Sequence, residues 1–492
     1  MRAPTDLYRP SLALLTDLYQ LTMAYAAWRT GCAEREAVFH LSFRRNPFGG
    51  GFAIACGLEY ALDHLSRLRF DADDIAYLAG LSAPGGGRLF ETDFLEALRV
   101  MPLALDVDAV PEGTAVFPHE PLVRVRGPII PCMLAETPLL NMINFQTLIA
   151  TKAARMVTAT RGEPVLEFGL RRAQGIDGAL AASRAAYVGG CAATSNVLAG
   201  RLFGIPVRGT HAHSWVMLFD SERDAFETYA RALPHNCVFL VDTYDTLEGV
   251  RNAIEVGAWL RRQGHELSGI RLDSGDLAYL SIEARKLLDA ASFHATQIVA
   301  TNDLDEQVIA SLKEQGATIA VWGVGTRLAT AYDEPALGGV YKLAAVRRPG
   351  EAWRYRVKLS EQAIKTSTPG VLQVRRFRVG AELIADAIFD EERGWPGGGD
   401  GTIVDPLDMT RRRKIPRGAE HSDLLVPALR AGQQVYDSPP LALVRERALA
   451  QMALLPTGTK RFLNAHQYPV GLEQSLFELK TRLVLEARAA AA

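Results

Sequence analysis

The stretch GIRLDSGDL, residues 269–277, shows most clearly which fold the chain adopts. A short apolar run ends in Asp273, Ser274 and Gly275, and a segment of helical length follows it. Other runs of this form recur between residues 164 and 322, which is typical of β-strand–α-helix units. Together they predict an α/β fold, an irregular barrel of the TIM type with its ligands at the carboxyl ends of the strands. The predicted strands are 164–168, 186–188, 206–209, 237–241, 269–272, 297–300 and 318–322.

The regions on either side of these units have other patterns. Residues 12–30 place apolar side chains at helical spacing, and residues 37–43 alternate as a strand does. Turn residues recur closely over 100–130, which indicates a small β-rich segment. Strand-like runs return beyond residue 338, with a glycine-rich loop at 391–402. We therefore predict an N-terminal α/β domain over 1–150, the barrel over 151–345, and a C-terminal segment over 346–492 that is β-rich and then helical.

Composition narrows the class of protein. With 48% hydrophobic and 22% charged residues the chain is not largely disordered, and its net charge of -2 gives no general attraction for nucleic acid or an anionic membrane. Asp6 and Asp17 interrupt any signal-peptide pattern, and no apolar run reaches the ~20 residues of a membrane-spanning helix. The five cysteines are odd in number and lack CxxC spacing, which favours reduced thiols in the cytoplasm. The basic run 411–414 is interpreted as a solvated loop.

The stretch VWGVGTRLA, residues 321–329, has the features of a phosphate site. Gly323 and Gly325 let backbone amides turn toward a ligand, and the Thr326 hydroxyl and the start of a following helix add further donors. A Gly-x-Gly turn alone more often only reverses the chain. Its place late in the predicted barrel favours phosphate binding.

Polar residues also end the strand of the opening stretch. Asp273, Ser274, Gly275 and Asp276 could hold ribose hydroxyls, or a magnesium ion that enters with a pyrophosphate. A helix cap by Asp273 or Ser274 is the alternative, and both interpretations can hold together. Arg271 alternates with its apolar neighbours and so points to the opposite face, where its guanidinium could bind a carboxylate or phosphate.

Two further segments carry candidate ligand-binding residues. His211 and His213 alternate in PVRGTHAHSWV, but no third metal ligand lies nearby, which disfavours zinc. An acid–base or nucleophilic histidine and a merely hydrogen-bonded one remain alternatives. In VLEFGLRRAQG, Phe168 with Arg171 and Arg172 could bind a flat anion, or could be a core ring beside surface arginines.

In this order, these segments resemble the nicotinate phosphoribosyltransferase family, and the match spans most of the chain. The segments that carry the resemblance are LLTDLYQLTMAY (14–25), FHLSFRRNPFGGGFAIACGL (39–58), EFGLRRAQG (167–175), GGCAATSNVLAGRLFGIPVRGTHAHSW (189–215), LVDTYDT (240–246), RLDSGDL (271–277), VWGVGTRLAT (321–330) and LGGVYKL (337–343).

The resemblance implies a type II phosphoribosyltransferase that uses ATP to join nicotinate and phosphoribosyl pyrophosphate (PRPP) into nicotinate mononucleotide, in NAD biosynthesis. It implies a homodimer with its sites near the subunit interface, Tyr19 stacking on nicotinate from the neighbouring subunit, and Mg²⁺ neutralising the pyrophosphate. His213 matches the histidine that ATP phosphorylates. By this resemblance and the patterns above, the predicted nicotinate-binding residues are Tyr19, Phe168, Arg171, Thr210 and Arg271, and the predicted PRPP-binding residues are Asp273 (also toward Mg²⁺), Ser274, Gly275, Gly323, Gly325 and Thr326.

Three rival functions differ in testable ways. Quinolinate phosphoribosyltransferase would need a denser basic cluster and no ATP. Nicotinamide as substrate is disfavoured because Thr194, Ser195 and Asn196 offer no carboxylate, where nicotinamide-specific relatives have an aspartate. A pseudoenzyme that only binds nucleotides, as a sensor or scaffold, is disfavoured by the presence of His213, Asp273 and Thr326.

Overall fold

The computed structural model describes residues 12–396 and 401–490. The chain forms two compact units: unit 1 is Met1–Leu148 with Ala336–Ala492, and unit 2 is Ile149–Pro335. The contacts group the first and last stretches of the chain into one unit. The division into three domains, at residues 150 and 345, stays a prediction. Asp6 and residues 397–400 of the predicted glycine-rich loop lie outside the described residues.

Unit 1 contains both ends of the chain because their strands pair directly. β1 pairs antiparallel with β5 on one side and with β12 on the other, and β3 pairs with β19. The strands follow the order β13-β12-β1-β5-β3-β19-β20. They are β1 (Glu36–Phe43), β3 (Asp106–Ala109), β5 (Val123–Pro128), β12 (Gly339–Arg347), β13 (Arg354–Tyr355), β19 (Val426–Arg430) and β20 (Gln433–Gln434).

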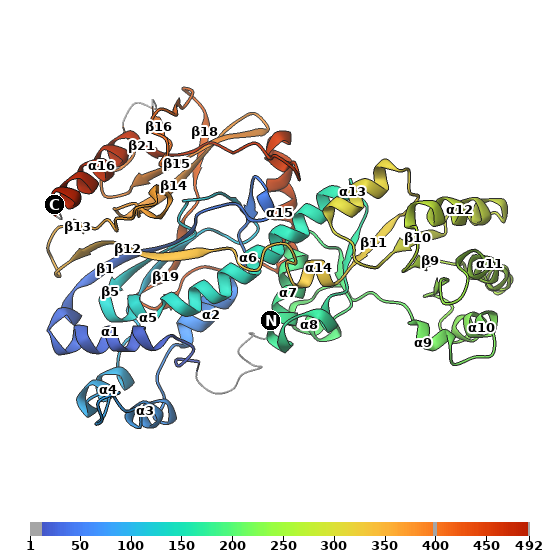
Figure 1. The fold of residues 1–492 in the computed structure, drawn as a ribbon, viewed down its shortest axis with the longest axis horizontal. Coiled ribbons are helices and arrows are strands. Elements are labelled where there is room, and N and C mark those ends of the chain that lie inside the picture. Colours follow the sequence, from blue (N-terminus) through green and yellow to red (C-terminus); the bar gives the residue numbers. More distant parts are fainter. Residues whose placement is uncertain (1–11, 397–400, 491–492) are drawn as a thin grey trace. The chain divides into compact units, whose positions relative to one another are not determined.

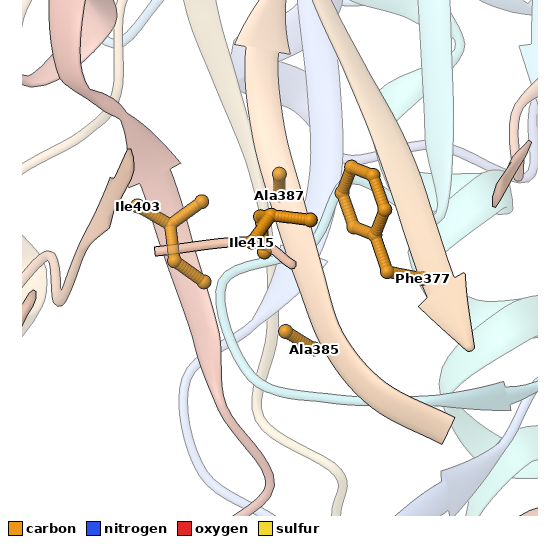
Figure 2. Close-up of a cluster of buried hydrophobic side chains, with 5 residues drawn as sticks. All are labelled: Phe377, Ala385, Ala387, Ile403 and Ile415. Atoms are coloured by element: carbon orange, nitrogen blue, oxygen red, sulfur yellow. The ribbon is translucent and has the colours of Figure 1, made fainter. Parts of the chain in front are cut away.

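A second sheet of unit 1 makes the C-terminal region rich in β-structure, as the sequence predicts. Its order is β17-β16-β21-β15-β14-β18. Figure 2 shows part of its core, where Phe377, Ala385, Ala387, Ile403 and Ile415 are at most 4% exposed. The strands are β14 (Leu372–Val379), β15 (Glu382–Asp390), β16 (Thr402–Val404), β17 (Arg412–Lys414), β18 (Glu420–Asp423) and β21 (Val470–Glu473), and β2 (Ala53–Ile54) pairs separately with β4 (Ala115–Val116). The basic run 411–414 is exposed as predicted, but it is not a loop, because residues 412–414 pair with β16 as the strand β17.

The helices of unit 1 include the one predicted over 12–30, which begins later, at Leu18. Tyr25 and Trp28 of this helix pack against Phe90 and Phe94, so its aromatic face is partly covered. The helices are α1 (Leu18–Arg29), α2 (Leu58–Arg67), α3 (Ala72–Ala79), α4 (Thr92–Arg99), α5 (Ile129–Leu134), α15 (Leu441–Leu454) and α16 (Gln474–Ala489); the boundary between the units falls within α6 (Glu136–Ala159).

Unit 2 is the α/β part, drawn from green to yellow in Figure 1. Its strands are all parallel, in the order β7-β6-β11-β10-β9-β8, and helices connect successive strands. The strands are β6 (Val165–Glu167), β7 (Ala193–Thr194), β8 (Val238–Leu240), β9 (Gly269–Leu272), β10 (Gln297–Ala300) and β11 (Val321–Val324). The helices are α7 (Gly175–Val188), α8 (Val197–Phe203), α9 (His213–Val216), α10 (Glu222–Ala232), α11 (Thr246–Arg262), α12 (Leu277–Ala290), α13 (Glu306–Glu314) and α14 (Thr326–Ala329).

Five of the seven strands predicted in this region form, and two predictions are wrong. Residues 186–188 are the last turn of α7, because the alanine-rich run before them favours helix, and the strand follows at Ala193–Thr194. Residues 206–209 make only an isolated bridge, between Val207 and Thr194. Parallel strands bring their carboxyl ends to one edge of the sheet, which we call the rim. In the ranges that the structure describes, every helix is too short or too polar to span a lipid bilayer.

Candidate active site at the rim

The strand order makes the polar ends of β9, β10 and β11 neighbours at the rim. Thr301, directly after β10, connects its two neighbours. Its hydroxyl donates to Asp273 Oδ1, and its methyl group would lie 2.6 Å from a Cβ built on Gly323. The predicted carboxylate loop and the predicted phosphate loop therefore belong to one continuous surface.

Arg271 lies on β9 between the fully buried Ile270 and Leu272, so its side chain takes the opposite face, as the alternation predicts. Its Nη1 donates to Thr210 Oγ1 at 2.6 Å. Its Nε is buried and finds no acceptor among the described residues. Burial lowers the pKa of Arg271, although Asp273 and Asp242 act to raise it. A buried donor without a partner costs about 1–3 kcal/mol, so this guanidinium is suited to an anionic ligand.

Asp242, two residues after the end of β8, organises the loop that follows β9. Its Oδ2 accepts from the Asp273 amide at 2.7 Å and from Ser274 Oγ at 2.8 Å. Its Oδ1 is buried and has no partner within the described part of the chain. Gly275 adopts a φ of 78°, which favours glycine, and Asp276 caps α12 by accepting two amides. The alternative that Asp273 or Ser274 is the cap is therefore wrong, and both side chains stay at the rim.

The two histidines have different surroundings. His211 is 8% exposed, and its ring packs near Phe226, Tyr229 and Phe239. Burial lowers the pKa of His211 to about 4. Its Nε2 accepts from the Leu240 amide at 3.3 Å, so this ring supports the wall of the site.

His213 begins the short helix α9 and is the accessible member of the pair. Its side chain is 40% exposed. Nδ1 lies 3.1 Å from Thr243 Oγ1, and Nε2 lies 3.9 Å from Asp273 Oδ2. One ring nitrogen is therefore held by a hydroxyl while the other faces the carboxylate loop.

The predicted phosphate loop is packed too closely at Gly323 to accept a side chain there. A Cβ on Gly323 would lie 2.9 Å from the ring of Phe168, and the Phe168 amide donates to Val324 O at 2.6 Å. Phe168, Gly323 and Gly325 therefore lie together. The helix α14 that follows is a single turn, Thr326–Ala329, so its dipole contributes little and a phosphate would depend on amides and the Thr326 hydroxyl.

Two other predicted nicotinate-binding residues, Arg171 and Tyr19, are exposed. Arg171 is exposed in the short helix Leu170–Arg172, close enough to Arg271 for its charge to lower the pKa of that residue. Tyr19 lies on α1 in unit 1, with 47% of its surface exposed.

The sequence interpretation assigned no role to four residues of the rim. Asp242 and Thr243 follow the predicted strand 237–241, and Thr301 follows β10, so the rule that picked out Asp273 would also have found them. Glu167 lies within a strand and carries no such signal. Glu167 is 1% exposed and accepts from the Gly169 amide, Ser183 Oγ (2.9 Å) and Thr194 Oγ1 (2.6 Å). It ties the segment that holds Phe168 to α7 and to the end of β7.

Comparison with known proteins identifies the family. Models of the N-terminal and C-terminal domains of nicotinate phosphoribosyltransferase match residues 14–144 and 373–480. The nicotinate phosphoribosyltransferase of Bacillus subtilis is 41% identical, with 97% of this chain and 96% of the relative aligned, and that of Homo sapiens is 36% identical, with 96% of each aligned.

Solved structures agree with this assignment. The crystal structure of human nicotinic acid phosphoribosyltransferase superposes with a TM-score of 0.82 at 33% identity, covering 95% of this chain and 99% of that one. A nicotinate-nucleotide pyrophosphorylase from Pyrococcus furiosus, at 20% identity and a TM-score of 0.67, covers 90% of this chain and 95% of its own, and shares the fold. The chain belongs to the nicotinate phosphoribosyltransferase family.

Proposed function

We propose that the chain joins nicotinate to phosphoribosyl pyrophosphate, giving nicotinate mononucleotide and pyrophosphate, and that it couples this reaction to ATP in cytoplasmic NAD biosynthesis. Membership of the family supports the reaction. The observation that carries the choice of an acid is the buried Nε of Arg271, which has no acceptor in the part of the chain that the structure describes, while Nη1 of the same side chain donates to Thr210. A pyridine carboxylate would accept from this donor, and Phe168 offers a flat apolar surface against the phosphate loop.

The rim also favours the acid over the amide. The loop Thr194–Asn196 carries no carboxylate of its own, and the nearby carboxylate of Glu167 already accepts from three donors. It is buried, so it does not meet a ligand as a free charge. An anionic substrate therefore finds the guanidinium of Arg271 without a competing exposed carboxylate from this loop.

His213 is the proposed phosphate acceptor from ATP. A neutral ring that donates from Nδ1 to Thr243 Oγ1 keeps its lone pair on Nε2. In the proposed step Nε2 forms a bond to the γ-phosphorus while the bond to the β-phosphate oxygen breaks, releasing ADP. Later hydrolysis of the phosphohistidine returns free His213 and phosphate. The added negative charge faces Asp273, so the cycle changes the electrostatics beside the pyrophosphate site.

Mg²⁺ is the metal that this chemistry implies, and the residues fit it. Mg²⁺ usually takes one or two carboxylates together with substrate oxygens. Asp242 and Asp273 supply carboxylates on adjacent loops, and Asp242 Oδ1 is buried without a partner among the described residues. No cluster of three or more protein ligands occurs in the described ranges, which suits an ion that enters with its substrate. Bound there, Mg²⁺ would neutralise the pyrophosphate leaving group.

The transfer itself requires positioning more than covalent help. The pyridine nitrogen forms a bond to the ribose anomeric carbon while the bond to pyrophosphate breaks, and positive charge develops on the sugar. Gly323, Gly325 and Thr326 are the proposed phosphate contacts, with Asp273 and Ser274 toward the ribose and pyrophosphate. Holding both substrates in line is the main contribution expected of these residues.

A homodimer is part of the proposal, with Tyr19 stacking on nicotinate in the partner's site. Leu15, just before α1, and Leu18, Tyr19 and Met23 on α1 are exposed, which supports a further protein contact there. A mixing experiment tests it. Tyr19→Ala and His213→Ala should each be impaired alone, and their exchanged dimers should regain activity because one site per dimer is then intact. Dimers that exchange without any gain would contradict shared sites.

A single assay tests the proposed function. Purified protein receives PRPP and Mg²⁺ with nicotinate, nicotinamide or quinolinate, with and without ATP. We expect nicotinate mononucleotide from nicotinate, formed faster with ATP, and little product from the other two. Turnover of quinolinate without ATP, or of nicotinamide in preference, would establish a rival activity, and no product with any base would refute the proposal.

A further inference from the structure

An unbroken chain of ion pairs lies behind the Gly323–Thr326 loop, within unit 2. One end is Arg327, which is partly exposed and lies directly after Thr326. Arg327 Nη1 donates to Asp305 Oδ2 at 2.9 Å and lies 4.0 Å from Asp333 Oδ1. Its guanidinium also lies 4.7 Å from the ring centre of Tyr332.

The other end of this series of ion pairs is buried and fixed in place. Lys152 bridges Asp333 (2.5 Å) and Glu306 (2.7 Å), and Arg155 Nε binds Glu306 at 2.7 Å. The side chains of Lys152, Arg155 and Glu306 are at most 2% exposed. Burial alone would raise the pKa of Glu306, but Lys152 and Arg155 lower it overall. Removing one of these buried charges would leave another unpaired, so this end resists movement.

The α14 turn, which carries Arg327, is not stable by itself. α14 is a single helical turn, and within the described ranges no side chain caps its start at Gly325. One turn fixes several backbone angles for very few hydrogen bonds, so it is unstable without tertiary contacts. Arg327 supplies such a contact through Asp305, which is itself fixed because its Oδ1 caps α13 by accepting the amides of Gln307 and Val308.

We propose that Arg327 is a positioning residue for PRPP: its ion pair with Asp305 holds the α14 turn, and with it Gly325 and Thr326, in the conformation that binds the phosphate. The inference rests on the proposed function of this loop. The alternative is that the guanidinium of Arg327, 30% exposed, contacts the phosphate directly.

Substitution at both ends of the ion pair separates these two roles. Asp305→Asn removes the charge that faces Arg327 but keeps a good cap for α13, since asparagine caps as well as aspartate. If Arg327 acts through Asp305, then Arg327→Gln and Asp305→Asn each raise KM for PRPP about fivefold or more, and the double variant is no worse than either alone. KM for nicotinate and the melting temperature should change little, and Arg327→Lys should recover part of the loss.

The matched control is Arg223→Gln, which breaks an exposed ion pair with Glu255 between α10 and α11 and should leave both KM values unchanged. A rise in KM for PRPP with Arg327→Gln but not with Asp305→Asn would overturn the proposal in favour of direct contact. Unchanged KM for PRPP in both variants, or equal rises for both substrates, would also overturn it. Absence of turnover in the unsubstituted protein would instead refute the proposed function.

Discussion

The half of the rim at β8 and β9 differs from the half at β11 and β6 in how space is filled. In the first, side chains project and hydrogen bonds fix them, as when Arg271 donates to Thr210 and Asp242 accepts from the loop after β9. In the second, the loop has no room for a side chain at Gly323, because the ring of Phe168 occupies the space beside it. Groups that carry charge need partners to orient them, whereas a backbone that binds phosphate needs room.

The largest expected effect comes from the polar half. Arg271→Ala should raise KM for nicotinate by ~30-fold or more, because truncating a buried charge partner costs about 2–5 kcal/mol. Arg271→Lys keeps the charge but loses the planar fork, so its effect should be smaller. Steady-state kinetics with nicotinate varied at saturating PRPP measures both, and an unchanged KM in Arg271→Ala would show that the carboxylate binds elsewhere.

The second prediction separates the two histidines of this half. His213→Ala should abolish the stimulation by ATP while slow, ATP-independent turnover remains, since only the phosphate acceptor is lost. His211→Gln should keep the stimulation, because its ring lies in an aromatic wall and binds the Leu240 amide. Initial rates with and without ATP test this. Stimulation that survives in His213→Ala would contradict the assignment.

The third prediction concerns the glycine half. Gly323→Ala should lower stability by about 1–3 kcal/mol and raise KM for both substrates, because its Cβ would lie 2.6 Å from Thr301 Cγ2 and 2.9 Å from the Phe168 ring. Gly178→Ala is the control, since nothing lies within 4 Å of its added Cβ in α7. Chemical denaturation and kinetics of both variants measure the difference, and a Gly323→Ala protein with normal KM values would show that this packing is not required.

The smallest expected effect is on pH dependence. The pKa of His211 is lowered to about 4 by burial, so the folded state favours the neutral ring while the unfolded chain takes up a proton near pH 6.5. Its contribution to stability is complete above pH 6.5 and is lost as the pH falls toward 4. His211→Gln should therefore show a shallower fall in melting temperature over this range. An identical slope in both proteins would mean that His211 does not titrate as described.

The pattern of apolar and polar residues along the sequence predicted individual strands well. The strands at 269–272 and 297–300 form at the expected residues, and alternation gave the orientation of Arg271. Residues 186–188 failed because a short apolar run fits a buried helix as well as a strand. The pairing of strands from both ends of the chain in unit 1 is also beyond local pattern, since it depends on contacts hundreds of residues apart.

For the candidate site, the sequence indicated which residues end the strands but not what holds them. Spacing did not reveal that His211 is enclosed by aromatic rings while His213 is accessible, because the extended segment ends where α9 begins. Nor did it reveal that Thr301 bridges Asp273 and Gly323. These relations arise from strand order, which follows only from the assembled sheet.

A crystal structure of the protein with bound nicotinate would show directly whether Arg271 binds the carboxylate. We expect a carboxylate oxygen within hydrogen-bond distance of Arg271 Nε, and the pyridine ring against Phe168. Nicotinate bound with its carboxylate on other residues, and Arg271 Nε still without an acceptor, would contradict this expectation.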